Sequence, residues 1–230
     1  MSEAVASPAG AGDLRWTLCG EQVHLLPERA LYWPARQTLL IADPHLGKAA
    51  AFRAGGVPVP AGTTAGNLRR LGRALTRTGA RRLVILGDLL HARAGRATAT
   101  LEEVSRWRVD FSHVEMMLVR GNHDERAGDP PADWSMHCVD EPCSDTPFAW
   151  RHTPGPDPQG YALAGHLHPA VRLTGSGAQA LTLPCFYFGR NYGLLPAFGE
   201  FTGTALIAPK RGDAVFVLAG SKVIAMGSSG

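Results

Sequence analysis

Short apolar runs alternate with amphipathic segments through the first half of the chain. A run that is apolar almost throughout predicts a buried strand, and three occur, at residues 38–43, 83–88 and 116–119. Segments 62–77 and 98–111 between these runs carry apolar residues at helical spacing, so they predict helices. Strand and helix in alternation are typical of an α/β domain.

The second half has a different pattern, of short β-like runs separated by glycine or proline. Such runs predict a second sheet that is mostly antiparallel. They lie at residues 148–151, 161–164, 171–174, 181–188, 204–207, 214–218 and 223–226. We therefore expect two packed sheets with outer helices. They would form a single domain at 14–226, between flexible tails at 1–13 and 227–230.

The composition indicates an ordinary globular protein of a reducing compartment. The chain has 230 residues, of which 45% are hydrophobic, and its four cysteines are scattered. No run approaches the roughly 18 apolar residues of a membrane span. The start of the chain lacks the basic and then apolar pattern of a secretion signal. We therefore expect a cytoplasmic protein without membrane association.

The net charge is only +3, but the arginines are unevenly distributed. Eight of them fall between residues 69 and 96, where Asp88 is the only acidic residue. A GC-rich coding sequence explains this without any function, whereas an anionic partner such as nucleic acid explains it as a binding surface. The composition leaves both explanations open.

Clusters of histidine with carboxylate or amide side chains stand directly after apolar runs. The four clusters are Asp43-Pro44-His45, Asp88 to His91, Asn122-His123-Asp124 and His166-Leu167-His168. These side chains bind divalent transition metals, and the carboxyl ends of strands are where open α/β sheets bind ligands. A solitary histidine is usually a surface or core residue, as we expect for His113 and His137. Five of the nine histidines lie in these clusters and His152 ends a further apolar run, which together predict a metal site.

The motifs DPHLGK, GDLLH, RGNHD, RHTP and GHLHP occur in this order between residues 43 and 169. Together they resemble the calcineurin-like metallophosphoesterase superfamily. The stretches LVILGDLLHARAG, VRGNHDERAG and LPCFYFG make the chain similar, more narrowly, to the bacterial ligase-associated DNA-damage-response metallophosphoesterases, the PdeM-like group. The resemblance implies an α/β fold, a four-layer α/β/β/α sandwich of two packed mixed sheets flanked by helices.

The same resemblance implies a centre with two divalent transition metals. By motif, one metal is bound by Asp43, His45, Asp88 and His168, and the other by Asp88, Asn122, His152 and His166. Mn²⁺ is the expected metal, with Fe or Zn²⁺ as alternatives, because the ligands mix nitrogen and oxygen. A water that bridges two such metals becomes hydroxide near neutral pH and attacks phosphorus in line with the leaving oxygen. His123 is the expected catalytic histidine, which protonates the leaving group or stabilises a charged oxygen.

Two positions depart from the common motif. Many members of the superfamily have aspartate where this chain has His91. We expect His91 to contact substrate phosphate as a donor or a cation rather than to orient His123 as an anion. Pro44 stands where leucine is frequent, and proline favours extended geometry at the preceding residue, here Asp43.

Basic and aromatic side chains near the motifs are further candidates for substrate contact. The basic ones are Lys48, Arg53, Arg93 and Arg120 beside the motifs, and Arg70, Arg73 and Arg77 along one predicted helix face. Aromatic rings stack on nucleobases in many nucleic-acid proteins. Phe186, Tyr187, Phe188, Tyr192 and Phe198 are the candidates for that role, although we favour core packing for most of them.

The resemblance implies a Mn²⁺-dependent DNA endonuclease of bacterial DNA repair that favours single-stranded DNA. Besides DNA, the partners that it implies are a ligase, a helicase and an exonuclease of a repair operon. A phosphodiesterase or phosphatase that acts on a small nucleotide, such as a cyclic nucleotide, is the alternative enzyme. A non-catalytic scaffold would have lost metal ligands, whereas every ligand position of the motifs is filled here.

Overall fold

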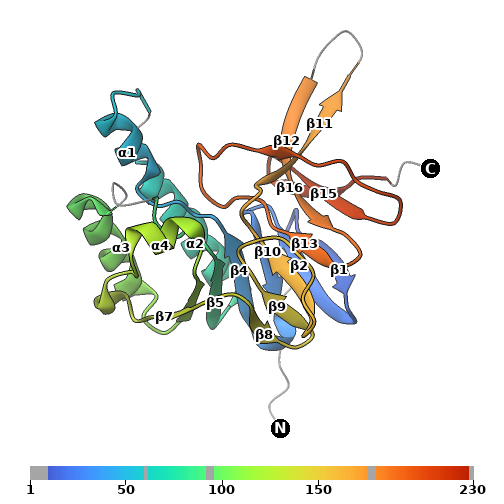
Figure 1. Ribbon diagram of the computed structural model, residues 1–230, viewed down its shortest axis with the longest axis horizontal. Helices are drawn as coiled ribbons and strands as arrows, with labels where there is room; N and C mark the ends of the chain where they lie inside the picture. The colour runs from blue at the N-terminus through green and yellow to red at the C-terminus, as the bar shows by residue number, and fades with distance from the viewer. Residues whose placement is uncertain (1–9, 60–61, 92–95, 176–179, 228–230) are drawn as a thin grey trace.

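The computed structural model describes residues 10–59, 62–91, 96–175 and 180–227. Two β-sheets pack face to face, and helices lie beside the β4–β7 side of the first sheet (Figure 1). Each sheet contains both parallel and antiparallel neighbours. The expected α/β fold with two packed mixed sheets is therefore confirmed.

The first sheet has seven strands, which lie in chain order from β1 to β7. Neighbours from β1 to β4 are antiparallel, and neighbours from β4 to β7 are parallel. The strands are β1 (Leu14–Leu18), β2 (Glu21–Leu26), β3 (Ala30–Trp33), β4 (Thr38–Ala42), β5 (Arg82–Leu86), β6 (Glu115–Val119) and β7 (Met136–Val139). The parallel strands bring the carboxyl ends of β4, β5 and β6 to one edge, which is where the first three polar clusters begin.

The second sheet has nine strands, in the order β14-β11-β12-β13-β10-β9-β8, with the β15–β16 hairpin attached to β12. Its strands are β8 (Cys143–Asp145), β9 (Phe148–Trp150), β10 (Tyr161–Ala164), β11 (Pro169–Thr174), β12 (Ala180–Phe188), β13 (Tyr192–Leu194), β14 (Ala205–Leu206), β15 (Ala214–Ala219) and β16 (Lys222–Ala225). Five of its pairings are antiparallel, but β10 is parallel to both β9 and β13, and β11 is parallel to β14. Because β9 and β10 are parallel, their carboxyl ends place His152 and His166 at the same edge of the sheet.

All the helices in the described chain lie before residue 135. They are α1 (Lys48–Ala54), α2 (Thr63–Thr78), α3 (Thr98–Asp110) and α4 (Asn122–Ala127), with 3-10 turns η1 (Pro34–Arg36) and η3 (Ala132–Trp134). None of them, within the described residues, has the length and apolarity needed to cross a bilayer. The described part after Trp134 contains strands and loops, so the outer helical layer expected on the second sheet is not seen there. The reason is visible in the sequence, because the runs after residue 135 are too short and too rich in glycine and proline for helices.

Strands β1 to β3 are elements that the apolar pattern did not single out. They form an antiparallel extension of the first sheet, joined by tight turns at Cys19-Gly20 and at Pro27–Arg29. All four residues of β3 are buried, so it carries no alternation of apolar and polar residues. A four-residue buried strand has too little periodicity to distinguish it from a loop.

Both faces of β4 are buried, which explains its unbroken apolar run. Leu39 and Ile41 pack toward the helices, whereas Leu40 and Ala42 pack toward the second sheet. The apolar stripe of α2, which consists of Leu68, Leu71 and Leu75, covers the helix side. The strand is therefore fixed from both sides directly before Asp43.

The start of the described chain is held by an arginine of α2. Residues 10–13 form a turn in which the side chain of Asp13 is only 2% exposed. Arg77 donates to the Asp13 carboxylate at 2.6 Å and to the Glu28 carboxylate at 2.7 Å. Arg73, on the same helix, is exposed. Residues 1–9 of the expected tail lie outside the described residues, and 10–13 pack against the domain.

We expect Arg77→Ala to lower the free energy of unfolding by about 1–3 kcal/mol, because it leaves the buried Asp13 carboxylate without its cation. The matched control is Arg73→Ala, an exposed position on the same helix, for which a change within about 0.5 kcal/mol is expected. Urea unfolding of the two variants measures both values. Equal stability of the two variants would show that the Asp13–Arg77–Glu28 cluster contributes nothing.

Candidate active site

The structure brings all seven predicted metal ligands to one edge of the two sheets. Asp43 and His45 follow β4, Asp88 follows β5, and Asn122 begins α4 directly after β6. The remaining three ligands come from the second sheet. His152 follows β9, and His166 and His168 lie between β10 and β11.

One group of donor atoms surrounds His168. The Nε2 atom of His168 lies 3.4 Å from Nε2 of His45 and 3.8 Å from Oδ2 of Asp43. Nδ1 of His168 lies 2.9 Å from the carbonyl oxygen of Gly203, so it carries the proton and donates there. Nε2 is then left with a lone pair. Burial and the nearby Lys48 lower the pKa of His45 to about 2, so the His45 imidazole is neutral near pH 7.

A second group of donor atoms surrounds His152. Its Nδ1 lies 3.1 Å from the carbonyl oxygen of Leu86 and therefore donates to it. Nε2 of His152 then keeps its lone pair, and three other potential metal-binding atoms lie near it. These are Oδ1 of Asn122 at 3.0 Å, Nδ1 of His166 at 3.0 Å and Oδ1 of Asp88 at 3.6 Å.

Asp88 belongs to both groups of donors. Its Oδ2 lies 3.7 Å from Nε2 of His45, while its Oδ1 faces His152. Asp43 is fully buried, and its Oδ1 atom has no hydrogen-bond partner. Two donors bound to the same ion at about 2.0–2.2 Å lie roughly 3–3.5 Å from each other. Spacings near these values, and an unpartnered buried carboxylate oxygen, fit two divalent cations that share Asp88.

Five of the seven ligands have left-handed backbones. The φ angles are 51° at Asp43, 43° at His45, 53° at Asp88, 68° at His166 and 51° at His168. Such angles are uncommon outside glycine and cluster at functional sites. The expectation that Pro44 makes Asp43 extended is wrong. Backbone hydrogen bonds from Asp43 to Gly87 and from Gly199 to Asp43, at 3.2 and 3.1 Å, outweigh the local preference.

Glycines before three of the ligands leave room for the metal-binding side chains. A Cβ atom on Gly121 would lie 2.4 Å from Oδ1 of Asp88, and one on Gly165 would lie 2.5 Å from Oδ2 of Asp43. A Cβ atom on Gly87 would lie 2.1 Å from Nδ1 of His152. Of the three, only Gly87 has a left-handed φ, at 80°. Close packing, more than a sharp change of chain direction, therefore explains these glycines.

Two carboxylates that the sequence analysis did not assign hold the ligand loops. Asp124 accepts hydrogen bonds from the backbone N–H groups of Asp88 at 2.7 Å, Leu89 at 3.0 Å and Gly121 at 2.9 Å. Burial raises the pKa of Asp124 to about 6. Glu141 accepts the N–H group of His152 at 2.6 Å. The GNHD motif contains Asp124, but Glu141 comes from a loop that no motif marks.

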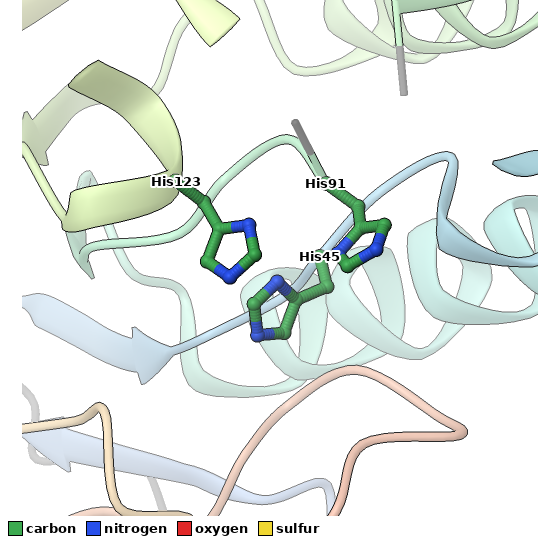
Figure 2. A group of neighbouring side chains, drawn as sticks. All are labelled: His45, His91 and His123. Carbon is green, nitrogen blue, oxygen red and sulfur yellow. The ribbon is translucent and has the colours of Figure 1, made fainter. Parts of the chain in front are cut away.

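Three histidines lie close together in the site, the buried His45 and the half-buried His91 and His123 (Figure 2). The rings of His91 and His123 stack with centroids 5.1 Å apart and an interplanar angle of 26°. Nε2 of His123 lies 3.9 Å from Oδ2 of Asp88. Burial and the nearby Lys48 lower the pKa of His91 to about 4. His91 is therefore neutral near pH 7 and offers an N–H donor rather than a charge.

Of the candidate phosphate contacts, Lys48 is closest to this cluster. Its ammonium lies 5.7 Å from the ring centre of Phe52, and that ring is 6.0 Å from the His91 ring. Arg53 is exposed on α1. Arg120 is ion-paired with Asp129 at 2.7 Å and Asp140 at 2.9 Å, and Arg93 lies outside the described residues.

The predicted arginine face of α2 is not a uniform free surface. Arg70 lies 4.5 Å over the Phe198 ring, donates to the Phe198 carbonyl, and pairs with Glu200 at 3.2 Å. Arg77 makes the contacts with Asp13 and Glu28 described above. Among the three residues, Arg73 is the exposed one and stays a candidate for DNA contact.

The five aromatic candidates for base stacking are inside the protein or packed on its flank. Phe186, Phe188 and Phe198 are buried. Tyr187 and Tyr192 are half-buried, with ring centroids 6.3 Å apart. Tyr187 also donates to Asp213 at 2.9 Å. Core packing therefore accounts for these side chains.

Comparison with known proteins gives a consistent picture. Residues 37–175 match the family of calcineurin-like phosphoesterases. This chain is similar to the crystal structure of Pseudomonas putida nuclease MPE, with 42% sequence identity and a TM-score of 0.82. The match covers 93% of this chain and 100% of that one. Yfce, a phosphoesterase from E. coli, matches at 17% identity and a TM-score of 0.39, over 84% of this chain and 99% of that one. No curated protein matches.

We expect Asp88→Ala to bind fewer than two equivalents of Mn²⁺, because its carboxylate contributes to both donor groups. Phosphodiesterase activity should be lost on every substrate. The control is Asp140→Ala, which removes an exposed carboxylate outside the site and should bind metal as the wild type does. Metal content by elemental analysis, together with circular dichroism for folding, measures the effect. Two bound metals in folded Asp88→Ala would contradict the bridging assignment.

Proposed function

The chain belongs to the calcineurin-like phosphoesterase family, and on this premise we propose that it is a Mn²⁺-dependent endonuclease that cuts single-stranded DNA. As a metallophosphoesterase it is a hydrolase of phosphoesters. The observation that carries the nuclease proposal is the 42% identity to a nuclease over nearly the whole chain. The complete set of seven ligand side chains at one edge of the sheets supports catalysis over a scaffold role.

Several residues of the chain would hold the metal ligands in place around the substrate phosphate. When bound, two divalent cations supply a water that is deprotonated near neutral pH and positive charge beside the phosphoryl oxygens. The carbonyl oxygens of Gly203 and Leu86 fix His168 and His152 through Nδ1, so Nε2 of each imidazole would be the atom that binds a metal. Asp124 holds the Asp88 loop through backbone N–H groups.

His123 is the residue that we assign to proton transfer. Its side chain is 27% exposed and lies next to Asp88 on the open side of the site, where a leaving oxygen can reach it. His91 stacks on the His123 ring and fixes its plane. As a neutral imidazole, His91 adds an N–H donor for a phosphate oxygen. Lys48 adds positive charge on the same side.

The biological setting follows from the resemblance to the ligase-associated group. We propose that the enzyme acts in bacterial DNA repair in the cytoplasm, beside a ligase, a helicase and an exonuclease. Hydrolysis of a small nucleotide, such as a cyclic nucleotide, is the competing activity of the same centre, because two metals and a histidine serve either substrate.

The substrate is tested with the apo-protein loaded separately with Mn²⁺, Mg²⁺, Zn²⁺ or Ca²⁺. Each form is incubated with circular single-stranded DNA, linear duplex DNA and a 2′,3′-cyclic nucleotide. We expect Mn²⁺ to be the best metal and single-stranded DNA to be the best substrate. The single-stranded DNA is circular because a circle has no ends, so its cleavage reports endonuclease cuts. Faster turnover of the cyclic nucleotide, with an intact circle, would favour the small-nucleotide activity.

We expect His123→Ala to keep two metals but to slow DNA cleavage about 10²–10⁴-fold, the usual contribution of general acid catalysis. A p-nitrophenyl phosphodiester, whose leaving group needs no proton, should show a much smaller defect. The measurement is kcat for both substrates in wild type and variant, with metal content as the control. Equal defects on both substrates would assign His123 to phosphate binding instead.

A further inference from the structure

The loop that follows Leu195 carries an unusual aromatic residue beside the metal ligands. Phe201 is 45% exposed and has a left-handed φ of 57°. Within the described residues, every other phenylalanine, tyrosine and tryptophan is buried or half-buried. A bulky residue with this φ is a backbone outlier, and such strain persists only where the surroundings impose it.

The loop is attached to the metal ligands on both sides of Phe201. On one side, the N–H groups of Phe198 and Gly199 donate to the carbonyl oxygens of Ala42 and Asp43, at 2.7 and 3.1 Å. On the other side, the Gly203 carbonyl accepts from Nδ1 of His168 at 2.9 Å. Since two residues span at most about 7 Å, the Phe201 backbone lies within that distance of Gly203.

Arginines fix the first of these attachments. Arg29 donates to the Gly199 carbonyl at 3.1 Å, and Arg70 donates to the Phe198 carbonyl while it stacks on the Phe198 ring. The loop is thus held at 198–199 and at 203, with Phe201 exposed between the two anchors. Because the loop backbone is fixed on both sides of Phe201, binding at this ring would require little further ordering of the loop, which suits a binding contact.

A second exposed apolar side chain adjoins the same metal ligand, His168. Leu167 separates the ligands His166 and His168 and is 41% exposed. The other aromatic ring near the site, that of Phe52, is already occupied, with Lys48 on its face and His91 at its edge. Phe201 and Leu167 are thus two exposed apolar side chains whose chain segments both adjoin His168, and we call this pair the Phe201 rim.

We propose that the Phe201 rim binds an unstacked nucleobase next to the scissile phosphate, with Phe201 as the stacking surface. This inference rests on the proposed nuclease function and deepens it. Aromatic rings stack on any base, so the contact is independent of sequence, but it needs a base that is free of its neighbours in a duplex. The rim thereby selects single strands, and the metal centre acts on the adjacent phosphate.

The test compares two p-nitrophenyl esters, of thymidine 5′-phosphate and of 2-deoxyribose 5′-phosphate, which lacks the base. Both have the same leaving group and the same phosphodiester. The quantity measured is the ratio of kcat/KM with the base to kcat/KM without it. In Phe201→Ala we expect this ratio to fall by roughly 5–150-fold, the usual range for one base–aromatic stack, mainly through KM.

Three further variants separate stacking from other effects. Phe201→Trp should keep the ratio, because it retains a ring, and Phe201→Leu should lose most of it despite its apolar side chain. Ile224→Ala, on β16, is the matched control, since Ile224 is 47% exposed and lies outside the site, and it should behave as the wild type does. An unchanged ratio in Phe201→Ala would overturn the inference, and if both esters lost activity equally the residue would have a structural role instead.

The failure of this inference is distinguishable from failure of the proposed function. If the wild type cuts the single-stranded circle but Phe201→Ala keeps the base ratio, only the rim is wrong. If the ratio falls as expected but the wild type leaves the circle intact, the rim binds a nucleobase of a free nucleotide, and the nuclease proposal is wrong.

Discussion

Two buried carboxylates, Asp43 and Asp88, dominate the physics of this molecule, because no lysine or arginine forms an ion pair with either of them in the part of the chain that the structure describes. Asp43 and Asp88 are 0% and 3% exposed, and the ion-pair contacts described for them involve histidines alone. Removing an ionised carboxylate from water costs several kcal/mol unless an opposite charge compensates it. An imidazole that binds a metal donates an electron pair but brings no charge. Divalent cations would supply the positive charge that the two carboxylates require, so metal binding would stabilise the folded structure as well as serve the reaction.

The backbone around these carboxylates is arranged at a cost that only a rigid scaffold can sustain. Each left-handed residue outside glycine costs about 1–3 kcal/mol, and five ligands have this conformation. The parallel strands β4 and β5 are buried on both faces, and they end directly before Asp43 and the Gly87-Asp88 turn. Asp124 and Glu141 then hold the loops through backbone N–H groups. Stability gained in the sheets thus offsets strain in the site.

The sequence predicts the parts of this structure whose signals are local. Apolar runs locate β4, β5 and β6, and helical spacing locates α2 and α3, because these elements bury long, regular stripes. The ligands are found because Asp-x-His and His-x-His place two donors on one turn, and because their order resembles a known family. The sequence pattern does not predict strands β1 to β3, because they are short and bounded by tight turns. It does not predict the role of Glu141 either, because that role depends on a contact with His152 eleven residues away.

The arginines show where composition is a poor guide to function. Four of the eight between residues 69 and 96 bond within the chain: Arg70, Arg77, Arg82 and Arg96. Such residues hold loops by donating to carbonyl and carboxylate oxygens, for which the planar guanidinium is well suited. Under the proposed function, a nucleic-acid ligand would find fewer free cations than the sequence suggests. Since neutralised phosphates dominate the affinity of proteins for nucleic acids, its attraction would be concentrated at the metal centre, close to the bond that breaks. Selection between substrates would then depend on uncharged groups near the centre, and among the described residues Phe201 is the exposed aromatic side chain.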